Sequence, residues 1–98
     1  MTRSVRFLPL ARLEAIEAWD WYAQRSPGLG EAFLLEIDRA VELISDNPLH
    51  YPRMLADIRR VRLRRFPYSL FFRVIEDECF VLACFHASRD PKRWQEHG

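Results

Sequence analysis

The stretch Ile58–His86, IRRVRLRRFPYSLFFRVIEDECFVLACFH, decides the fold, because it reads as three consecutive β-strands. From Ile58 onward, apolar residues alternate with arginines, the pattern of a strand with one buried face. Residues 68–75 and 79–86 are almost continuously apolar, which indicates strands buried on both faces. The polar residues 76–78 between them have the length of a hairpin turn. We therefore expect a three-stranded antiparallel meander at the C-terminal end of the chain.

Upstream of the meander, the sequence predicts a short strand and two helices. Ser4–Leu8 alternates as a strand, and Pro9 suits the first turn of a helix. A first helix is expected over about 10–25 and a second over about 29–46, and the break between them is short enough to form an antiparallel hairpin. The apolar residues expected to face the core are Ala15, Ile16, Trp19, Tyr22 and Ala23 in the first helix, and Leu29, Phe33, Ile37, Ala40, Val41 and Ile44 in the second.

The order of elements is thus β-α-α-β-β-β, with a loop over 50–57. It predicts an α+β fold of two layers, in which the helical hairpin packs on the sheet. The length of 98 residues fits one domain spanning 1–98. We also expect a short turn or helix at the C-terminal end, around Trp94.

Charge is divided unevenly along the chain, although the net charge is only +1. Residues 1–50 carry five arginines against eight acids, a balance of −3. Residues 51–98 carry nine arginines and one lysine against six acids, a balance of +4. This asymmetry predicts a polarised surface whose basic side meets an anionic partner.

The two cysteines, Cys79 and Cys84, are five residues apart in one predicted strand, so they should point to opposite faces and stay reduced. No metal-ligand spacing or glycine-rich phosphate loop is present, so we expect no metal and no cofactor. The N-terminal region has no apolar run long enough for a signal peptide or a membrane span. We therefore expect a cytoplasmic protein without a membrane partner.

Arginines form the first candidate functional group. Arg60, Arg62 and Arg64 alternate with apolar residues and are expected to share one face of a strand. Such a strip suits an anionic partner, either RNA or an acidic protein segment, because guanidinium groups bind phosphate and carboxylate through paired donors. An ordinary solvated sheet face explains the same pattern about equally well.

A second group lies where the last strand leaves the sheet. His86 is a candidate general base and Arg89 a candidate phosphate ligand. Spacing alone favours a simpler interpretation, a hydrogen-bonded histidine at a strand end beside a surface charge. Glu14 and Glu17 are interpreted as helix-surface charges. Trp21 lies beside the apolar stripe of the first helix, so we expect it to be exposed and to anchor a protein interface.

Several of these segments, taken in order, resemble toxins of the ParE/RelE superfamily. The segments 17–37 (EAWDWYAQRSPGLGEAFLLEI) and 46–54 (DNPLHYPRM) resemble the helical hairpin of ParE-like toxins and the segment that follows it. Residues 59–94 resemble their C-terminal sheet, including FPYSLFFRV and the ending H-x-x-R-D-P-x-x-W. The similarity runs from about Val5 to Trp94, and it is the ordered set of segments that makes it specific.

The resemblance implies the toxin of a type II toxin–antitoxin pair, of the kind also called plasmid stabilisation proteins in bacteria. Such a toxin is neutralised by a cognate antitoxin, and the complex contacts operator DNA only through the antitoxin. ParE-like members are associated with inhibition of DNA gyrase, and RelE-like members with cutting mRNA on the ribosome. We expect Arg60, Arg62, Arg64 and Trp21 to contact the antitoxin.

The alternative to gyrase inhibition is a ribosome-dependent endoribonuclease that uses Arg60, Arg62, His86 and Arg89. RNA-cutting members carry an arginine directly after the tyrosine of the third strand, and here Ser69 stands at that position. They also end with a functional tyrosine, for which the nearest aromatic residue here is Trp94. These departures favour a ParE-like toxin that acts by binding.

Overall fold

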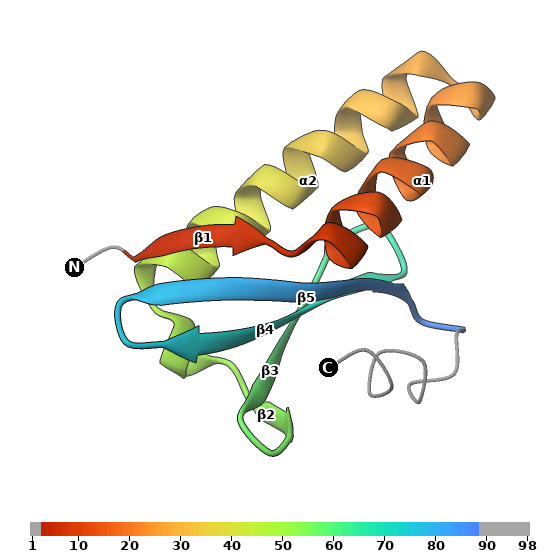
Figure 1. Ribbon diagram of the computed structural model, residues 1–98. Helices are drawn as coiled ribbons and strands as arrows, with labels where there is room; N and C mark the ends of the chain where they lie inside the picture. Colours follow the sequence, from red (N-terminus) through yellow and green to blue (C-terminus); the bar gives the residue numbers. More distant parts are fainter. Residues whose placement is uncertain (1–2, 89–98) are drawn as a thin grey trace.

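The computed structural model describes residues 3–88, in which two helices lie on one face of a five-stranded sheet (Figure 1). The strand order is β1-β5-β4-β3-β2, with β1 parallel to β5 and the other neighbours antiparallel. The predicted α+β architecture and element order are confirmed. The elements are β1 (Ser4–Phe7), α1 (Pro9–Arg25), α2 (Pro27–Asp46), the 3-10 helix η1 (Pro48–His50), β2 (Arg53–Leu55), β3 (Ile58–Arg62), β4 (Tyr68–Ile75) and β5 (Glu78–His86).

One strand was not expected. β2 lies within the segment predicted to be a loop, and it pairs with β3 at the edge of the sheet. Its three residues, Arg53–Leu55, are all exposed, so the burial pattern that reveals a strand in a sequence is missing. The predicted C-terminal turn around Trp94 lies outside the described residues.

The two helices form the expected hairpin. Each begins with a proline, whose fixed φ angle and missing N–H suit the first turn of a helix. Only Ser26 separates them. At Gly30 the helices come so close that a Cβ atom would lie 2.8 Å from the Cβ atom of Ala23. Glycine at this position therefore allows α1 and α2 to pack tightly.

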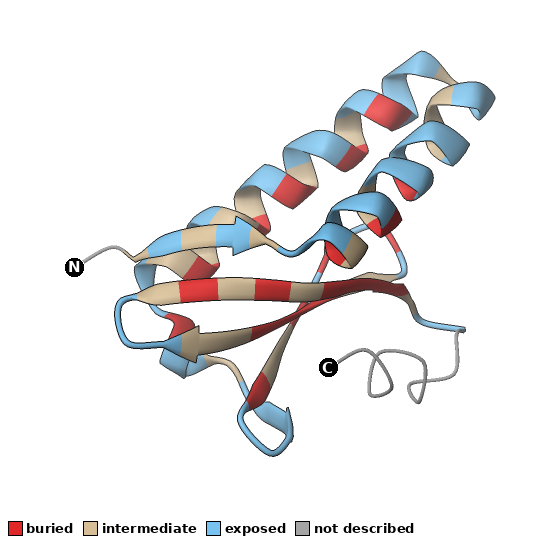
Figure 2. Cartoon of the chain, in the orientation of Figure 1, coloured by how far each residue is buried: buried red, intermediate tan, exposed pale blue. Residues whose placement is uncertain are grey.

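The main core lies between the hairpin and the sheet, where buried positions line the facing surfaces (Figure 2). Phe33 of α2 is fully buried, and its ring lies 5.4 Å from that of Tyr22, measured between centroids. Phe66 and Tyr68 complete this aromatic group, with centroids 5.3 and 5.5 Å from Phe33. Pairs in this range add stability beyond their buried area. The predicted core residues of α2 are confirmed at Phe33, Ile37, Ala40 and Ile44, whereas Leu29 is exposed.

The core prediction for α1 is confirmed at Ala15 and Tyr22, which pack against the main core, and was wrong at Ile16 and Trp19. The buried residues of this helix are Ala11, Glu14 and Ala18, whereas Ile16 is 51% exposed and Trp19 is 36% exposed. Apolar residues are spread around α1, so their spacing does not define one stripe. The face with small side chains turns inward because it lets the helix backbone approach the sheet closely.

A β-bulge interrupts the pairing of β4 with β5. Phe71 pairs with Ala83, but its neighbour Phe72 pairs with Val81, so Leu82 is an extra residue in β5. Because side chains in a strand alternate between faces, an extra residue reverses the alternation beyond it. The segment of β5 that follows the bulge therefore has the opposite orientation to that expected from simple counting.

The cysteines display this reversal. Cys79 precedes the bulge and Cys84 follows it, and both lie in the core that faces the helices. The prediction that they point to opposite faces was therefore wrong. Both are free and buried, and burial raises the pKa of the Cys79 thiol. Within residues 3–88, no helix has both the length and the apolar character needed to cross a membrane.

Candidate functional site

Arg60 and Arg62 lie on the sheet face that the helices do not cover. In the β3–β4 pair, Arg60 is opposite Phe71 and Arg62 is opposite Ser69, and directly paired residues point to the same face. Phe71 belongs to a second apolar cluster, separate from the core beneath the helices. Its members are Ile58, Phe71, Ala83 and Phe85.

The two guanidinium groups are near enough for the charge of one to affect the other. Burial lowers the pKa of Arg60, and the positive charge of Arg62 lowers it further. Within residues 3–88, no carboxylate forms a salt bridge with either arginine. Arg73 of β4, in contrast, is paired with Asp57 at 3.1 Å. The arrangement of Arg60 and Arg62 therefore favours binding of an anionic group, which would relieve their mutual repulsion.

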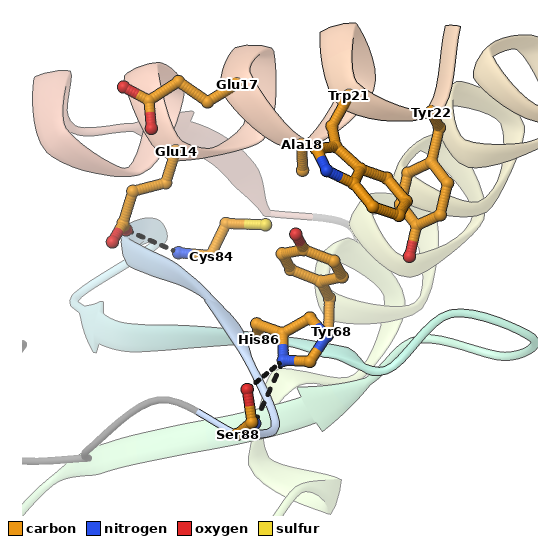
Figure 3. A pocket seen from close by; sticks show the side chains of 9 residues that line it. All are labelled: Glu14, Glu17, Ala18, Trp21, Tyr22, Tyr68, Cys84, His86 and Ser88. Atoms are coloured by element: carbon orange, nitrogen blue, oxygen red, sulfur yellow. Dashed lines mark hydrogen bonds between the residues drawn. The ribbon is translucent and has the colours of Figure 1, made fainter. Parts of the chain in front are cut away.

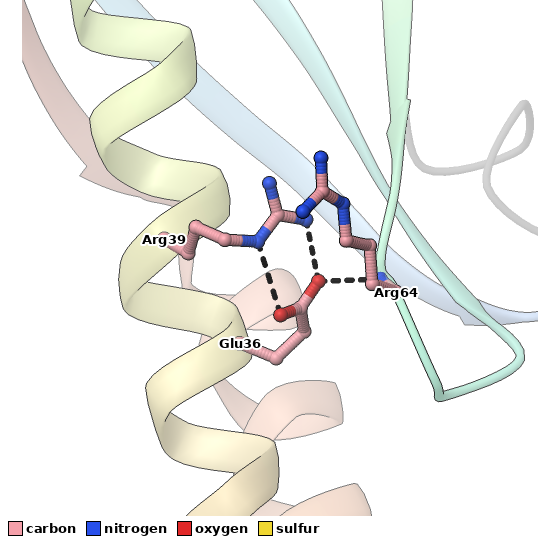
Figure 4. Close-up of polar contacts among 3 residues, drawn as sticks. All are labelled: Glu36, Arg39 and Arg64. Atoms are coloured by element: carbon pink, nitrogen blue, oxygen red, sulfur yellow. Dashed lines mark hydrogen bonds and ion pairs between the residues drawn. The ribbon is translucent and has the colours of Figure 1, made fainter.

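Arg64 does not belong to this pair, so the prediction that three arginines share one strand face was wrong. β3 ends at Arg62, and the backbone N–H of Arg64 donates to the carboxylate of Glu36 on α2 (Figure 4). The same carboxylate accepts from the guanidinium of Arg39, which is the main reason its pKa is lowered. Glu36 thus ties the β3–β4 connection to the helical layer, and Arg64 lies beside Arg39.

On the helical side of the sheet, a pocket of about 420 Å³ opens between α1 and the ends of β4 and β5. Trp21 and Tyr22 project from α1 toward Tyr68 and His86 on the strands (Figure 3). Aromatic rings and carboxyl groups make up most of the wall. The lining residues are Glu14, Glu17, Ala18, Trp21, Tyr22, Tyr68, Cys84, His86 and Ser88.

His86 is held at the floor of this pocket. Its ring is perpendicular to that of Tyr68, with centroids 5.1 Å apart. The backbone N–H of Ser88 donates to Nδ1 at 3.0 Å, and the Ser88 hydroxyl lies 2.8 Å from the same atom. Ser88 therefore occupies Nδ1 of the imidazole from two of its own groups, the backbone N–H and the hydroxyl.

Glu14 forms the inner wall of the pocket, although it was predicted to be a surface charge. Its side chain accepts a hydrogen bond of 3.0 Å from the backbone N–H of Cys84, and the residue is only 7% exposed. β1 ends at Phe7, which pairs with Val81, and beyond that point no strand of residues 3–88 pairs with β5 on this edge. Glu14 supplies the missing acceptor, because a buried N–H without a partner costs free energy.

Trp21 forms the outer rim and is 49% exposed, so its predicted exposure is confirmed. The Arg25 guanidinium lies over its ring, 3.3 Å from the centroid, and also donates to the Trp21 carbonyl. This is a cation–π contact. The indole thus already holds one guanidinium group from its own helix.

The predicted site residues therefore fall into separate places. Arg60 and Arg62 lie together on the open face, whereas His86 lies on the helical face because the bulge reverses β5. Arg89 lies outside the described residues. Among residues 3–88, no group of three or more histidines, cysteines and acids could hold a metal ion.

Sequence reasoning missed Glu14 and Tyr68 as pocket residues. No short-range signal marks Glu14, because its burial depends on where β1 ends in the folded sheet. Tyr68 was predictable as a strand residue, but its contact with His86 depends on the bulge.

This two-layer arrangement, with a helical hairpin on a mixed sheet, is the fold of ParE/RelE-type toxins. A chain of the chromosomal ParDE TA system from P. aeruginosa superposes with a TM-score of 0.76 at 20% identity, covering 89% of this chain and 98% of that one. A chain of the toxin–antitoxin complex RelBE2 from Mycobacterium tuberculosis gives 0.60 at 22% identity, covering 90% and 95%. A mutant of the E. coli toxin RelE in the free state gives 0.57 at 18% identity, covering 90% and 86%.

Residues 5–91 match the family model of the ParE toxin of the type II toxin–antitoxin system parDE. The chain belongs to this family, as the resemblance of its hairpin and sheet predicted. No curated protein sequence matches it significantly. It is therefore a toxin of a toxin–antitoxin system, with a cognate antitoxin as its partner.

Proposed function

We propose that this toxin acts by binding DNA gyrase and inhibiting it, and that the cognate antitoxin neutralises it. The observation that carries the proposal is the separation of its candidate proton carrier from its paired arginines. His86 is on the helical face of the sheet, whereas Arg60 and Arg62 are on the other face. A toxin that only binds its target does not need these groups at one point.

Cleavage of RNA has stricter requirements. Attack by a 2′-hydroxyl needs a base, an acid and positive charge at a single phosphate. Arg60 and Arg62 can stabilise that charge, but the only described histidine of the predicted set faces away from them, and its Nδ1 accepts from Ser88. Ser69, which pairs with Arg62, adds a hydroxyl and no charge. The geometry of residues 3–88 therefore supports binding more than catalysis.

The endoribonuclease remains the second candidate, because an arginine pair that forms no salt bridge with any carboxylate of residues 3–88 also suits a phosphate backbone. It would use Arg60, Arg62, His86 and Arg89, the last of which lies outside the described residues. Two assays on the purified full chain separate the candidates. Gyrase supercoiling is measured with increasing toxin, and primer extension maps mRNA cuts in a translation extract.

Gyrase inhibition with intact mRNA is the expected result. Codon-phased cuts that disappear in Arg60→Ala and Arg62→Ala, with gyrase unaffected, would replace the proposal with the endoribonuclease. Arg53→Ala is a suitable control for lost positive charge, because Arg53 is exposed on the edge strand β2 and was not assigned to either site.

For antitoxin recognition, we propose that Arg60 and Arg62 contact acidic residues and that Trp21 is an apolar anchor. Arg64 would contribute at a different place, near α2. Charge reversal at Arg60 and Arg62 should weaken the complex, and the loss should shrink as salt rises because screening reduces the remaining attraction. Calorimetry of the double variant Arg60→Glu, Arg62→Glu against wild type measures this. Unchanged affinity at moderate salt would reject the ionic role.

A further inference from the structure

We propose that the guanidinium groups of Arg39 and Arg64 together bind one carboxylate of the antitoxin, where α2 meets the β3–β4 connection. The inference rests on the proposed contact of Arg64 with the antitoxin, and it adds a second arginine and the chemical class of the ligand. Arg39 belongs to α2 and Arg64 to the connection between the strands, so the site joins the two layers of the fold. These two residues are called the corner arginines below.

Glu36 brings the corner arginines together. Its carboxylate accepts from Nε and Nη2 of Arg39 and from the backbone N–H of Arg64 (Figure 4). The charges of both guanidinium groups lower the pKa of Glu36, so both groups lie within electrostatic range of the same carboxylate. Two positive charges are therefore held around one negative charge, which leaves one positive charge in excess among these three side chains.

The corner arginines keep N–H donors for a further acceptor. A guanidinium group has five N–H donors in a fixed plane. Arg39 directs Nε and Nη2 at Glu36, so its Nη1 remains for another partner. The guanidinium of Arg64 forms no salt bridge with any carboxylate of residues 3–88. A carboxylate suits this arrangement, because its two oxygens can accept from two guanidinium groups at once.

Exposure places the cations in front of the acid. The side chain of Arg39 is 29% exposed and that of Glu36 only 11%, and Arg64 is an exposed residue. An approaching partner therefore meets the guanidinium groups before it meets the Glu36 carboxylate. One incoming carboxylate balances the excess positive charge, whereas a run of phosphates would bring further negative charges close to Glu36. The local charge thus favours an acidic side chain of a protein over a nucleic-acid backbone.

The turn that carries Arg64 is fixed on both sides. The backbone N–H of Arg64 is bound to Glu36, and Phe66, two residues further on, is buried in the aromatic group of the core. Between them Arg65 has a φ of 70°, in the left-handed region, which makes the turn tight. Since the backbone is already ordered, binding restricts only the side chain of Arg64, and this lower entropic cost favours affinity.

The first test measures the affinity of the cognate antitoxin for the full chain by calorimetry, with Arg64→Gln as the variant and Arg65→Gln as the matched control. Both changes remove one exposed arginine from the same turn, and Arg64→Gln keeps the backbone N–H that donates to Glu36. We expect Arg64→Gln to weaken binding by about tenfold, as for one lost hydrogen bond to a charged group, and Arg65→Gln by less than about threefold. Arg64→Lys should recover only part of the loss, because an ammonium group lacks the forked donors.

Equal losses for Arg64→Gln and Arg65→Gln, or no loss for either, would overturn the site. The second test identifies the ligand by double-mutant cycles, in which each acidic residue of the antitoxin is changed to its amide and paired with wild type and with Arg64→Gln. One of these changes should cost affinity against wild type and little against Arg64→Gln. If no acidic residue shows this coupling, the ligand is not a carboxylate. Neither test involves gyrase, so a failure here is distinguishable from a failure of the proposed target.

Discussion

Replacement of Glu14 by alanine should destabilise this toxin more than any other single change to a charged residue of α1. Glu14 is 7% exposed and accepts from the backbone N–H of Cys84, which is 1% exposed. A hydrogen bond to a charged group contributes about 1.5–3 kcal/mol, and the N–H left behind has no strand opposite it on that edge. We therefore expect a loss of about 2–3 kcal/mol, a large part of the roughly 5–15 kcal/mol that stabilises a typical domain.

The measurement is urea denaturation followed by far-UV circular dichroism, together with hydrogen exchange at the Cys84 amide. Glu14→Gln keeps an acceptor oxygen and should lose about 1 kcal/mol, because a neutral hydrogen bond is weaker than a charged one. Glu17→Ala, one turn further along α1 and exposed, should change stability by less than about 0.5 kcal/mol. If Glu14→Ala were no more destabilising than Glu17→Ala, the account of Glu14 as the edge partner of β5 would be refuted.

Two further predictions concern packing and pH. Gly30→Ala should lower the free energy of unfolding by about 1–3 kcal/mol, because the new Cβ atom would lie 2.8 Å from the Cβ atom of Ala23. Gly28→Ala is the control, since the nearest atom to its new Cβ would be 3.9 Å away, and it should be neutral or slightly stabilising. Thermal melts of both variants measure the difference. The lowered pKa of Glu36 means that its contribution to stability is complete above the ordinary value of 4.5 and is lost as pH falls through the lower folded value. Wild type should therefore lose more stability than Glu36→Gln between about pH 5 and 3, and parallel pH curves would contradict this.

The layers of the fold were predictable because they depend on local patterns. Alternation around Val61 and the apolar runs of β4 and β5 identified the meander, and the breaks at Pro27 and Asn47 bounded the hairpin. What the sequence could not supply were features that depend on contacts between distant segments. The buried face of α1 is set by how closely small side chains let it approach the sheet. The burial of Glu14 is set by the length of β1, a strand that pairs with a segment more than seventy residues away.

The site was less predictable than the fold, and a single residue accounts for much of the difference. Counting along β5 without interruption places Cys79 and His86 on opposite faces, which would bring His86 to the side of Arg60 and Arg62. The extra residue at Leu82 reverses that parity, so His86 joins Cys79 on the helical side. Nothing local marks Leu82, since neither glycine nor proline adjoins it. An alternating pattern therefore locates a strand reliably, but it assigns a side chain to a face only as far as the first bulge. In this toxin the bulge decides whether a histidine and an arginine pair can act on the same phosphate.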